Sequence, residues 1–266
     1  MTRRLDAELV ARGLARSRAR ARALVDGGRV RIDGRPVSKP AAPVGTAAAI
    51  EVIDPGPDWV GRGALKLAPA LAAFGLDVRG RRCVDVGAST GGFTQVLLHE
   101  GAAQVVALDV GHGQLARSLA GDPRVVDRSG LSVRDLAPGE VGGPFDVLVA
   151  DLSFIPTSLV MADLRRLVTP DGDALLLVKP QFEVGRRRLG KNGVVRSAAD
   201  RAWAIRTVAR AAAEVGWRTH GAMRSPVVGA TGNIEYLLWL AARDDGALGW
   251  EAVVGRADAL SVEGTP

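Results

Sequence analysis

A glycine-rich stretch between a predicted strand and a predicted helix offers the first chemical possibility in this chain. Residues 84–94 read V-D-V-G-A-S-T-G-G-F-T, and Ser89 lies in G-A-S-T-G, which fits the G-x-S-x-G nucleophile elbow of esterases and lipases. Asp151 and His220 follow Ser89 in the chain order of a hydrolase triad. No H-G-G-G-like segment precedes the motif, however, and His220 is predicted to lie in or just before a strand. A hydrolase would also leave the neighbouring acids and the strand-end lysines without a role.

The same stretch predicts a cradle for a nucleotide-like cofactor. Its glycines at 87, 91 and 92 let the backbone approach a ligand, and the helix that follows presents free N–H groups. Ser89 interrupts the G-x-G-x-x-G pattern of dinucleotide sites, and the absence of a following G-K-[ST] excludes a P-loop. Asp109 ends the next predicted strand, where a carboxylate can accept both hydroxyls of a ribose. Together these features predict S-adenosylmethionine as the cofactor.

Further cofactor contacts are expected just before the loop and after the third strand. Asp85 can order the loop or reach the amino-acid end of the cofactor, and the segment D-R-S-G places two polar residues on the adenine side. The predicted cofactor-binding residues are Asp85, Gly87, Ser89, Gly91, Gly92, Phe93, Asp109, Asp127 and Ser129.

The segment after the fourth predicted strand indicates which atom is methylated. Enzymes that methylate exocyclic amines carry [D/N]-P-P-[F/Y] there, and A-D-L-S-F does not fit that pattern. Methylation at C5 of a base needs a cysteine nucleophile, but the single cysteine, Cys83, lies on the first strand and is expected in the core. A hydroxyl acceptor is favoured, and it needs a group that takes its proton or stabilises the alkoxide.

Four charged residues are predicted to supply that group. Lys179 ends the fifth strand in L-L-L-V-K-P, and burial beside this apolar run favours the neutral amine. Asp151 ends the neighbouring strand, while Lys66 in R-G-A-L-K-L and Glu235 in G-N-I-E-Y complete the set. We expect Lys179 to receive the hydroxyl proton or to favour its loss electrostatically. Asp151 and Lys66 would set the charge state of Lys179, and Glu235 would orient the ribose or the lysine.

The elements that position these residues alternate between strand and helix from residue 60 onward. This rhythm predicts an α/β fold with a doubly wound, mostly parallel sheet. Two final strands at about 217–224 and 233–240, joined by a short loop, predict an antiparallel hairpin at one edge. Residues 243–266 read as a weakly patterned tail, and F-E-V-G-R-R-R-L-G-K-N-G after Lys179 is a candidate flap.

The amino-terminal segment predicts a small α+β module with a basic surface. Residues 1–50 carry 11 Arg and Lys against 4 acids, whereas the whole chain has a net charge of +6. Ser17 is a predicted N-cap for a helix over 18–26, and R-V-R-I-D-G-R-P-V predicts a hairpin that turns at Asp33-Gly34. The segregated charge indicates a polyanionic partner. The predicted RNA-binding residues are Arg4, Arg16, Arg18, Arg20, Arg22, Arg29 and Arg31.

The remaining composition narrows the class of protein. No apolar run approaches the roughly 18 residues of a membrane span, and no apolar region follows M-T-R-R-L-D as it would in a secretory signal. The three histidines do not pair at the spacings of metal ligands, so no metal site is expected. We expect a cytoplasmic protein that does not contact membranes.

At this point the chain resembles the TlyA family of ribosomal RNA 2′-O-methyltransferases over nearly its whole length. R-L-D-A-E-L-V-A-R-G-L-A-R-S-R and G-R-V-R-I-D-G resemble an S4 RNA-binding domain. V-D-V-G-A-S-T-G-G-F-T, A-D-L-S-F-I, V-K-P-Q-F-E and G-N-I-E-Y resemble an FtsJ-like methyltransferase domain. The resemblance implies a Rossmann-like class I methyltransferase fold with seven strands and a catalytic tetrad of Lys66, Asp151, Lys179 and Glu235.

The resemblance also implies a substrate and a domain organisation. It implies methylation of cytidine 2′-hydroxyls in 16S and/or 23S rRNA within ribosomal subunits. We expect the protein to be a monomer or a weak dimer. An S4-like domain and linker are expected at 1–58, the methyltransferase domain at 59–242 and the tail at 243–266. Family members also carry the name haemolysin. A lytic or purely RNA-binding protein and a serine hydrolase that uses Ser89 remain the alternatives.

Overall fold

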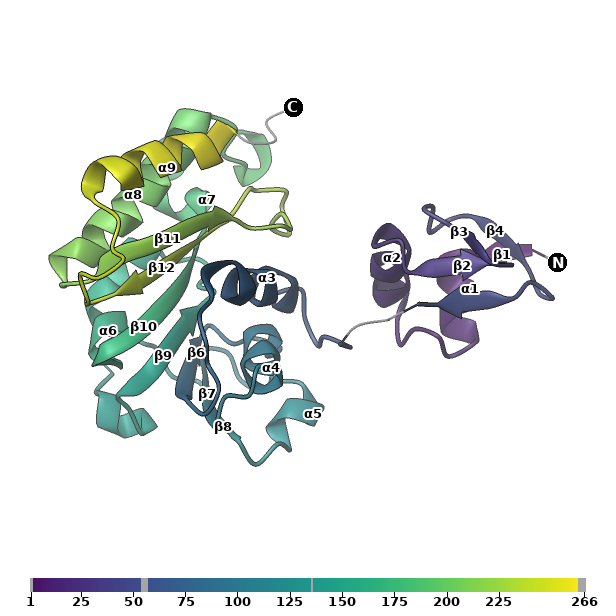
Figure 1. Ribbon diagram of the computed structural model, residues 1–266, viewed down its shortest axis with the longest axis horizontal. Coiled ribbons are helices and arrows are strands. Elements are labelled where there is room, and N and C mark those ends of the chain that lie inside the picture. The colour runs from purple at the N-terminus through teal and green to yellow at the C-terminus, as the bar shows by residue number, and fades with distance from the viewer. Residues whose placement is uncertain (1, 54–56, 135, 263–266) are drawn as a thin grey trace. The chain divides into compact units, whose positions relative to one another are not determined.

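The computed structural model describes residues 2–53, 57–134 and 136–262 (Figure 1). The chain divides into two compact units, Met1–Asp58 and Trp59–Pro266. Residues 54–56, which belong to the predicted linker, lie outside the described residues. Trp59 packs edge-on against His99 of the second unit with the ring centroids 5.4 Å apart.

The first unit combines two helices with short strands. Its elements are β1 (Thr2–Arg4), α1 (Leu5–Ala11), α2 (Arg18–Asp26), β2 (Val30–Ile32), β3 (Arg35–Pro36), β4 (Pro43–Gly45) and β5 (Ile50–Val52). Leu5 and Leu9 of α1 pack with Leu24 and Val25 of α2 in a small apolar core. The predicted helix cap is confirmed, because the Ser17 side chain accepts a hydrogen bond from the backbone N–H of Arg20.

The second unit contains the longer elements. Its helices are α3 (Ala64–Phe74), α4 (Gly92–His99), α5 (Arg117–Ala120), α6 (Met161–Arg166), α7 (Pro180–Glu183), α8 (Ala198–Glu214) and α9 (Trp250–Val262). Its strands are β6 (Arg82–Val86), β7 (Gln104–Asp109), β8 (Val125–Ser129), β9 (Phe145–Ala150), β10 (Val168–Val178), β11 (Arg218–Arg224) and β12 (Tyr236–Ala241). Short 3₁₀ turns lie at η1 (Pro138–Val141), η2 (Thr157–Val160), η3 (Arg186–Arg188) and η4 (Lys191–Gly193).

Seven strands of the described residues form one sheet in the order β11-β12-β10-β9-β6-β7-β8 (Figure 1). The five strands from β10 to β8 are parallel, whereas β12 runs antiparallel to both β10 and β11. The predicted doubly wound sheet and its antiparallel edge are therefore confirmed. Parallel strands bring the residues that follow them to one edge, so the segments after β6, β7, β9 and β10 meet there.

Alternating side chains of the strands pack against helices on the two faces of the sheet. Val84, Leu148 and Leu176 share one apolar cluster with residues of α6, α8 and α9. Cys83, Val147 and Leu175 share another with residues of α3 and α4. This near-continuous apolar sequence is typical of strands buried on both faces, and it fixes the strand ends in a rigid frame.

Two segments differ from their sequence predictions. The alternation of strand and helix predicts a short helix over 112–119, but the structure confines it to α5 at Arg117–Ala120. The carboxy-terminal segment was expected to be weakly patterned, but Trp250–Val262 form α9, whose Val253, Ala257 and Leu260 are buried. Its apolar positions at intervals of three and four residues are typical of an amphipathic helix, and the flanking polar residues obscured that pattern.

Candidate active site

The glycine-rich loop joins β6 to α4 at the carboxyl edge of the sheet. Gly87 has φ +84°, and a Cβ atom there would lie 2.8 Å from the backbone oxygen of Asp151. The loop is also held to the neighbouring strand, because the Gly87 N–H donates to the backbone oxygen of Leu108 at 2.8 Å. Glycine is therefore required where the loops after β6 and β9 approach each other.

Asp85 holds this loop in place through hydrogen bonds to Thr94. Its Oδ2 accepts hydrogen bonds from the backbone N–H of Thr94 at 2.8 Å and from the Thr94 hydroxyl at 2.7 Å. The side chain is fully buried, and this desolvation raises the pKa of Asp85 to about 7 despite the two hydrogen bonds. Of the two roles predicted for Asp85, the structure supports ordering of the loop, because Asp85 ties β6 to the first turn of α4.

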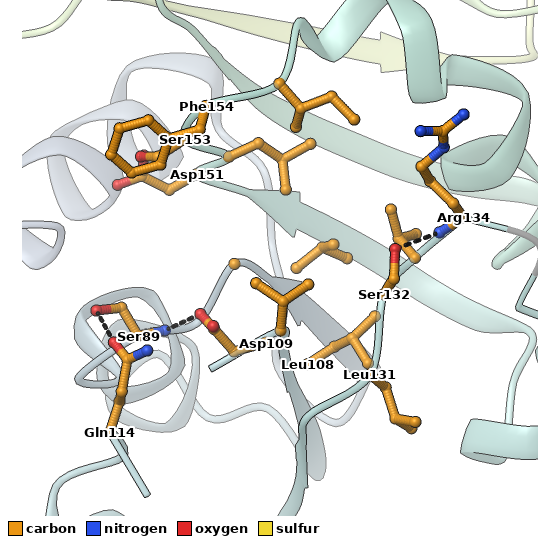
Figure 2. A pocket seen from close by; sticks show the side chains of 16 residues that line it. Ser89, Leu108, Asp109, Gln114, Leu131, Ser132, Arg134, Asp151, Ser153 and Phe154 are labelled. Atoms are coloured by element: carbon orange, nitrogen blue, oxygen red, sulfur yellow. Dashed lines mark hydrogen bonds between the residues drawn. The ribbon is translucent and has the colours of Figure 1, made fainter. Parts of the chain in front are cut away.

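Asp109 connects two loops at the end of β7. Its Oδ2 accepts from the backbone N–H of Ser89 at 2.8 Å, and its Oδ1 accepts from that of Gly111 at 2.7 Å. The Ser89 hydroxyl donates to Gln114 Oε1 at 3.2 Å (Figure 2). The carboxylate is thus fixed at the pocket wall in the place predicted for ribose recognition.

A pocket of about 470 Å³ opens between the loops after β6, β7, β8 and β9. In Figure 2, Ser89, Asp109 and Gln114 lie on one side, Leu131 to Arg134 on a second, and Asp151, Ser153 and Phe154 on a third. Its apolar walls include Leu108, Leu131, Val133, Leu152 and Ile155. An apolar cleft in which the Asp109 carboxylate is held in place suits the flat base and ribose of S-adenosylmethionine.

The other predicted cofactor residues divide into two groups. Phe93 and Gly92 line a second pocket of about 260 Å³ beside the loop, and Gly91 packs so closely on Leu119 that a Cβ atom would lie 2.3 Å from its Cδ1. Asp127 and Ser129 do not line the first pocket. Instead, the Ser129 N–H and hydroxyl both donate to Asp127 Oδ1, and residues 131–134 form the wall on that side.

The four predicted catalytic residues form one continuous chain of contacts. Lys66 Nζ lies 2.7 Å from Glu235 Oε2 and 3.5 Å from Asp151 Oδ2. Lys179 Nζ lies 2.7 Å from Asp151 Oδ1 and donates a hydrogen bond to Ser153 Oγ at 2.6 Å. Lys66, Lys179 and Glu235 are all buried, and each lysine contacts at least one carboxylate of the set.

The strand register explains why these residues meet. Ala150 pairs with Leu176, and Val178 pairs with Tyr236, so Asp151, Lys179 and Glu235 all come directly beyond paired strand ends. Lys66 approaches from the first turn of α3. Gly229 leaves room for the carboxylate, because a Cβ atom there would lie 2.5 Å from Glu235 Oε1.

A third pocket of about 590 Å³ adjoins the tetrad. It shares Lys179 and Glu235 with the second pocket, and it shares Ser153 and Phe154 with the first. Arg186, Leu189, Asn192 and Gly193 of the predicted flap form part of its wall. The tetrad therefore lies where the three pockets meet.

Two aromatic rings flank this third pocket. Phe154 is 93% exposed and has a positive φ of 67°, which is unusual for a bulky residue. Its ring lies 5.6 Å from that of Phe182, and Lys179 Nζ lies 5.9 Å from the centre of the Phe182 ring. An exposed ring held in a strained backbone position marks a functional surface.

The arginines of the first unit gather around acids that orient them. Arg4 Nη2 lies 2.9 Å, Arg22 Nε 3.2 Å and Arg18 Nη2 3.4 Å from Oδ2 of Asp6, which is fully buried. The hydrogen bond from Arg4 is the main cause of the lowered pKa of Asp6. Arg16 Nε lies 3.0 Å and Arg20 Nε 3.6 Å from Asp58 Oδ1. The three half-exposed guanidinium groups of Arg4, Arg18 and Arg22 thus share the carboxylate of Asp6.

The remaining predicted RNA contacts lie on the hairpin. Arg31 lies on β2 and is exposed, whereas Arg29 directly precedes β2 and is half-buried.

Comparison with protein families identifies both units. Residues 3–50 match the S4 domain, and residues 59–242 match the FtsJ-like methyltransferase model. The 16S/23S rRNA (cytidine-2′-O)-methyltransferase TlyA of Mycobacterium tuberculosis is 52% identical over 258 residues, which are 96% of each chain. The chain belongs to the TlyA family of FtsJ-like methyltransferases. Its cofactor is therefore S-adenosylmethionine.

Other members of the TlyA family carry a second kind of name. Hemolysin A of Brachyspira hyodysenteriae is 34% identical over 88% of this chain and 98% of its own. A solved structure from Streptococcus thermophilus that also bears a hemolysin name has a TM-score of 0.70 and 34% identity, and the match covers 97% of this chain and 96% of that one.

The structure argues against the hydrolase alternative for this TlyA family member. His220 lies within β11 between Thr219, which pairs with Leu240, and Gly221, which pairs with Trp239. Its ring centroid lies 5.1 Å from that of Trp239 with the rings tilted, and its Nε2 lies 3.1 Å from the backbone oxygen of Arg243. His220 therefore lies on a strand four positions away in the sheet from β6, which precedes Ser89. Cys83 is equally unsuited to nucleophilic attack, because burial raises its pKa to about 12.

Several residues of the site were not predicted from the sequence. Thr94, Gln114, Ser153 and the segment 131–134 have no distinctive type or spacing, although Ser153 and Phe154 lie within A-D-L-S-F. Within the described part of the chain, no helix is long and apolar enough to cross a membrane, and no cluster of His, Cys, Asp and Glu could hold a metal ion.

Proposed function

We propose that this protein transfers a methyl group from S-adenosylmethionine to the 2′-hydroxyl of a cytidine in 16S and/or 23S rRNA. The observation that carries the proposal is the Lys66–Asp151–Lys179–Glu235 chain at the meeting point of three pockets. The 52% identity to a TlyA with that activity in its name also supports the proposal.

The residues of the first pocket would hold the cofactor. Asp109 is placed to accept the ribose hydroxyls, and the apolar side chains of residues 131–133 would cover the adenine. Gly87 and Ser89 face both the first and the second pocket, so their backbone would border the amino-acid portion. When bound, S-adenosylmethionine supplies an electrophilic methyl group on a positively charged sulfur.

The tetrad would remove the proton from the ribose hydroxyl. Because an alcohol is a weak nucleophile at neutral pH, it needs a base within hydrogen-bond reach. Lys179 faces the second and third pockets and receives that proton as a neutral amine. Asp151, which contacts both lysines, stabilises the ammonium group that forms, while Lys66 lies between the carboxylates of Asp151 and Glu235 and offsets their charge.

The third pocket would receive the target nucleoside. A ribose at Lys179 places its base in the adjoining space, where Phe154 and Phe182 offer stacking surfaces. Arg186 of the flap lines the same pocket and would contact a phosphate.

The first unit would bind rRNA through Arg4, Arg16, Arg18, Arg20, Arg22, Arg29 and Arg31. Arginines that share Asp6 are fixed before the ligand arrives, which lowers the entropy cost of binding phosphates. An enzyme of ribosomal RNA acts where subunits are assembled, and we propose a cytoplasmic location. The monomer or weak dimer expected from the sequence stays a prediction.

Methylation of isolated ribosomal subunits tests this function directly. The purified full chain is incubated with small or large subunits and S-adenosylmethionine that carries an isotopically labelled methyl group, and the modified nucleotides are mapped by mass spectrometry. We expect label on the 2′-oxygen of cytidine, and none with the Lys179→Ala variant. Label on a base or on protein, or no label with either subunit, would contradict the proposal.

A further inference from the structure

Ser153 contacts the tetrad without belonging to it. It lies two residues beyond Asp151, and its Oγ accepts a hydrogen bond from Lys179 Nζ at 2.6 Å. This contact is as short as the one between Lys179 and Asp151, which measures 2.7 Å. Lys179 is thus held by two oxygens of the same loop, one charged and one neutral.

The location of Ser153 is as informative as its contact. Ser153 and Phe154 are the two residues that line both the cofactor pocket and the third pocket, among the residues that the structure describes. Figure 2 shows Ser153 beside Asp151 at one end of the cofactor pocket. The reacting hydroxyl must lie close to this junction, because methyl transfer joins the contents of the two pockets.

The chemistry of a neutral amine gives Ser153 its role. A neutral lysine has two N–H bonds and one lone pair on Nζ, and the lone pair must point at the hydroxyl that loses its proton. The ion pair with Asp151 Oδ1 and the hydrogen bond to Ser153 Oγ occupy two sides of Nζ, so in the neutral amine the lone pair is left a direction away from both oxygens. A single anchor would leave Nζ free to rotate about the Cε–Nζ bond.

We propose that Ser153 is a positioning residue that orients the lone pair of Lys179 toward the target hydroxyl. In the step it supports, the O–H bond of the ribose breaks, a new N–H bond forms on Lys179, and the electron pair stays on oxygen. The Phe182 ring lies 5.9 Å from Nζ and offers no hydrogen-bond acceptor of comparable strength. Ser153 therefore acts through Lys179, and its role rests on the proposed function of the site.

A pair of variants with equal shape isolates the hydroxyl. Ser153→Thr keeps the acceptor, whereas Ser153→Val has the same branching without it, and Ser153→Ala removes the hydroxyl with no added bulk. Each full-length variant is tested by the rate of single-turnover methylation of ribosomal subunits at saturating S-adenosylmethionine. Because misplacement of a catalytic group costs up to about 10²-fold in rate, we expect Val and Ala to be slowed by roughly 10- to 100-fold. Thr should react at close to the unsubstituted rate.

Two further measurements separate orientation from binding. The affinity for S-adenosylmethionine, measured by calorimetry, and the KM for the subunits should be unchanged in all three variants, with the loss confined to kcat. Equal rates for Thr and Val would overturn the role of Ser153, because the hydroxyl would then make no difference. Absence of methyl transfer by the unsubstituted chain would instead overturn the proposed function, and the role of Ser153 with it.

Discussion

Lys66 Nζ lies 2.7 Å from Glu235 Oε2, and the two side chains are less than a tenth exposed. The first comes from the first turn of α3 and the second from the residue before β12, so the ion pair joins segments far apart in the sequence. Charges buried to this extent are tolerated when each has a partner. The contact with Asp151 extends the pair to Lys179, so the four side chains form one connected ionic cluster.

We expect Lys66→Met to destabilise the second unit strongly. Methionine keeps the length of the side chain but leaves Glu235 and Asp151 short of a cation, and breaking a buried pair costs about 3–5 kcal/mol. All five tryptophans lie at or beyond residue 59, so denaturant unfolding followed by tryptophan fluorescence reports this unit alone.

The double variant Lys66→Met/Glu235→Leu is the control for that measurement. It removes both charges of the pair and should recover part of the lost free energy of unfolding. A single variant as stable as the unsubstituted protein would contradict the burial of this pair.

We expect Lys179→Ala and Lys179→Arg to be equally inactive. Alanine removes the base, and arginine keeps a cation but does not release its proton in proteins. Loss of a general base lowers the rate by roughly 10²–10⁴-fold. The rate is measured in single-turnover methylation of ribosomal subunits, with calorimetry to show that S-adenosylmethionine still binds. Substantial activity of the arginine variant would show that Lys179 acts as a fixed charge and not as a proton acceptor.

The strand-end residues were predictable because each follows an apolar run. Lys179 comes after L-L-L-V and Asp151 after V-L-V-A, and in a parallel sheet such residues share one edge. Strand–helix alternation likewise predicted the doubly wound sheet, and Ser17 predicted the start of α2. In each case a short stretch of sequence is enough, because apolar runs, strand–helix alternation and N-cap residues have the same structural meaning in most folds.

The parts that escaped prediction depend on contacts made through the fold. Asp127 was expected on the adenine side because D-R-S-G was assigned to the loop after the third strand, but Asp127 lies within β8, and residues 131–134 line the pocket. The positive φ of Phe154 and the hydrogen bond from Lys179 to Ser153 cannot be predicted from the types and spacing of residues. The grouping of arginines around Asp6 also depends on how α1 meets α2.

We expect Asp109→Ala to weaken binding of S-adenosylmethionine and Asp127→Ala to leave it unchanged. Asp109 ends β7 and Asp127 lies within the neighbouring parallel strand β8, but only Asp109 lines the pocket, so Asp127 serves as the control. A hydrogen bond to a charged group contributes about 1.5–3 kcal/mol, which corresponds to roughly 10- to 100-fold in the dissociation constant. Isothermal titration with S-adenosylmethionine measures both variants. Weaker binding of S-adenosylmethionine by Asp127→Ala would show that Asp127 contributes to the cofactor site.

We expect Arg18→Ala/Arg22→Ala to weaken binding to ribosomal subunits and to reduce its dependence on salt. Each lost phosphate contact lowers the slope of log K against log salt by about one unit. Arg206→Ala is the control, because this arginine of α8 pairs with Asp258 on the second unit. Affinities are measured by filter binding at several salt concentrations. An unchanged slope in the double variant would contradict the role of these arginines.

Asp85 predicts how stability depends on pH. Burial raises its pKa from 3.8 to about 7, so between these values the folded protein holds a proton that the unfolded chain releases. The contribution of Asp85 to the free energy of unfolding must therefore fall as the pH rises from about 4 to about 7. Asp85→Asn keeps an oxygen for the two hydrogen bonds from Thr94 and cannot ionise. We expect this variant to gain stability relative to the unsubstituted protein over that range, as measured by tryptophan fluorescence in denaturant at each pH. A constant difference between the two proteins across the range would mean that Asp85 does not titrate there.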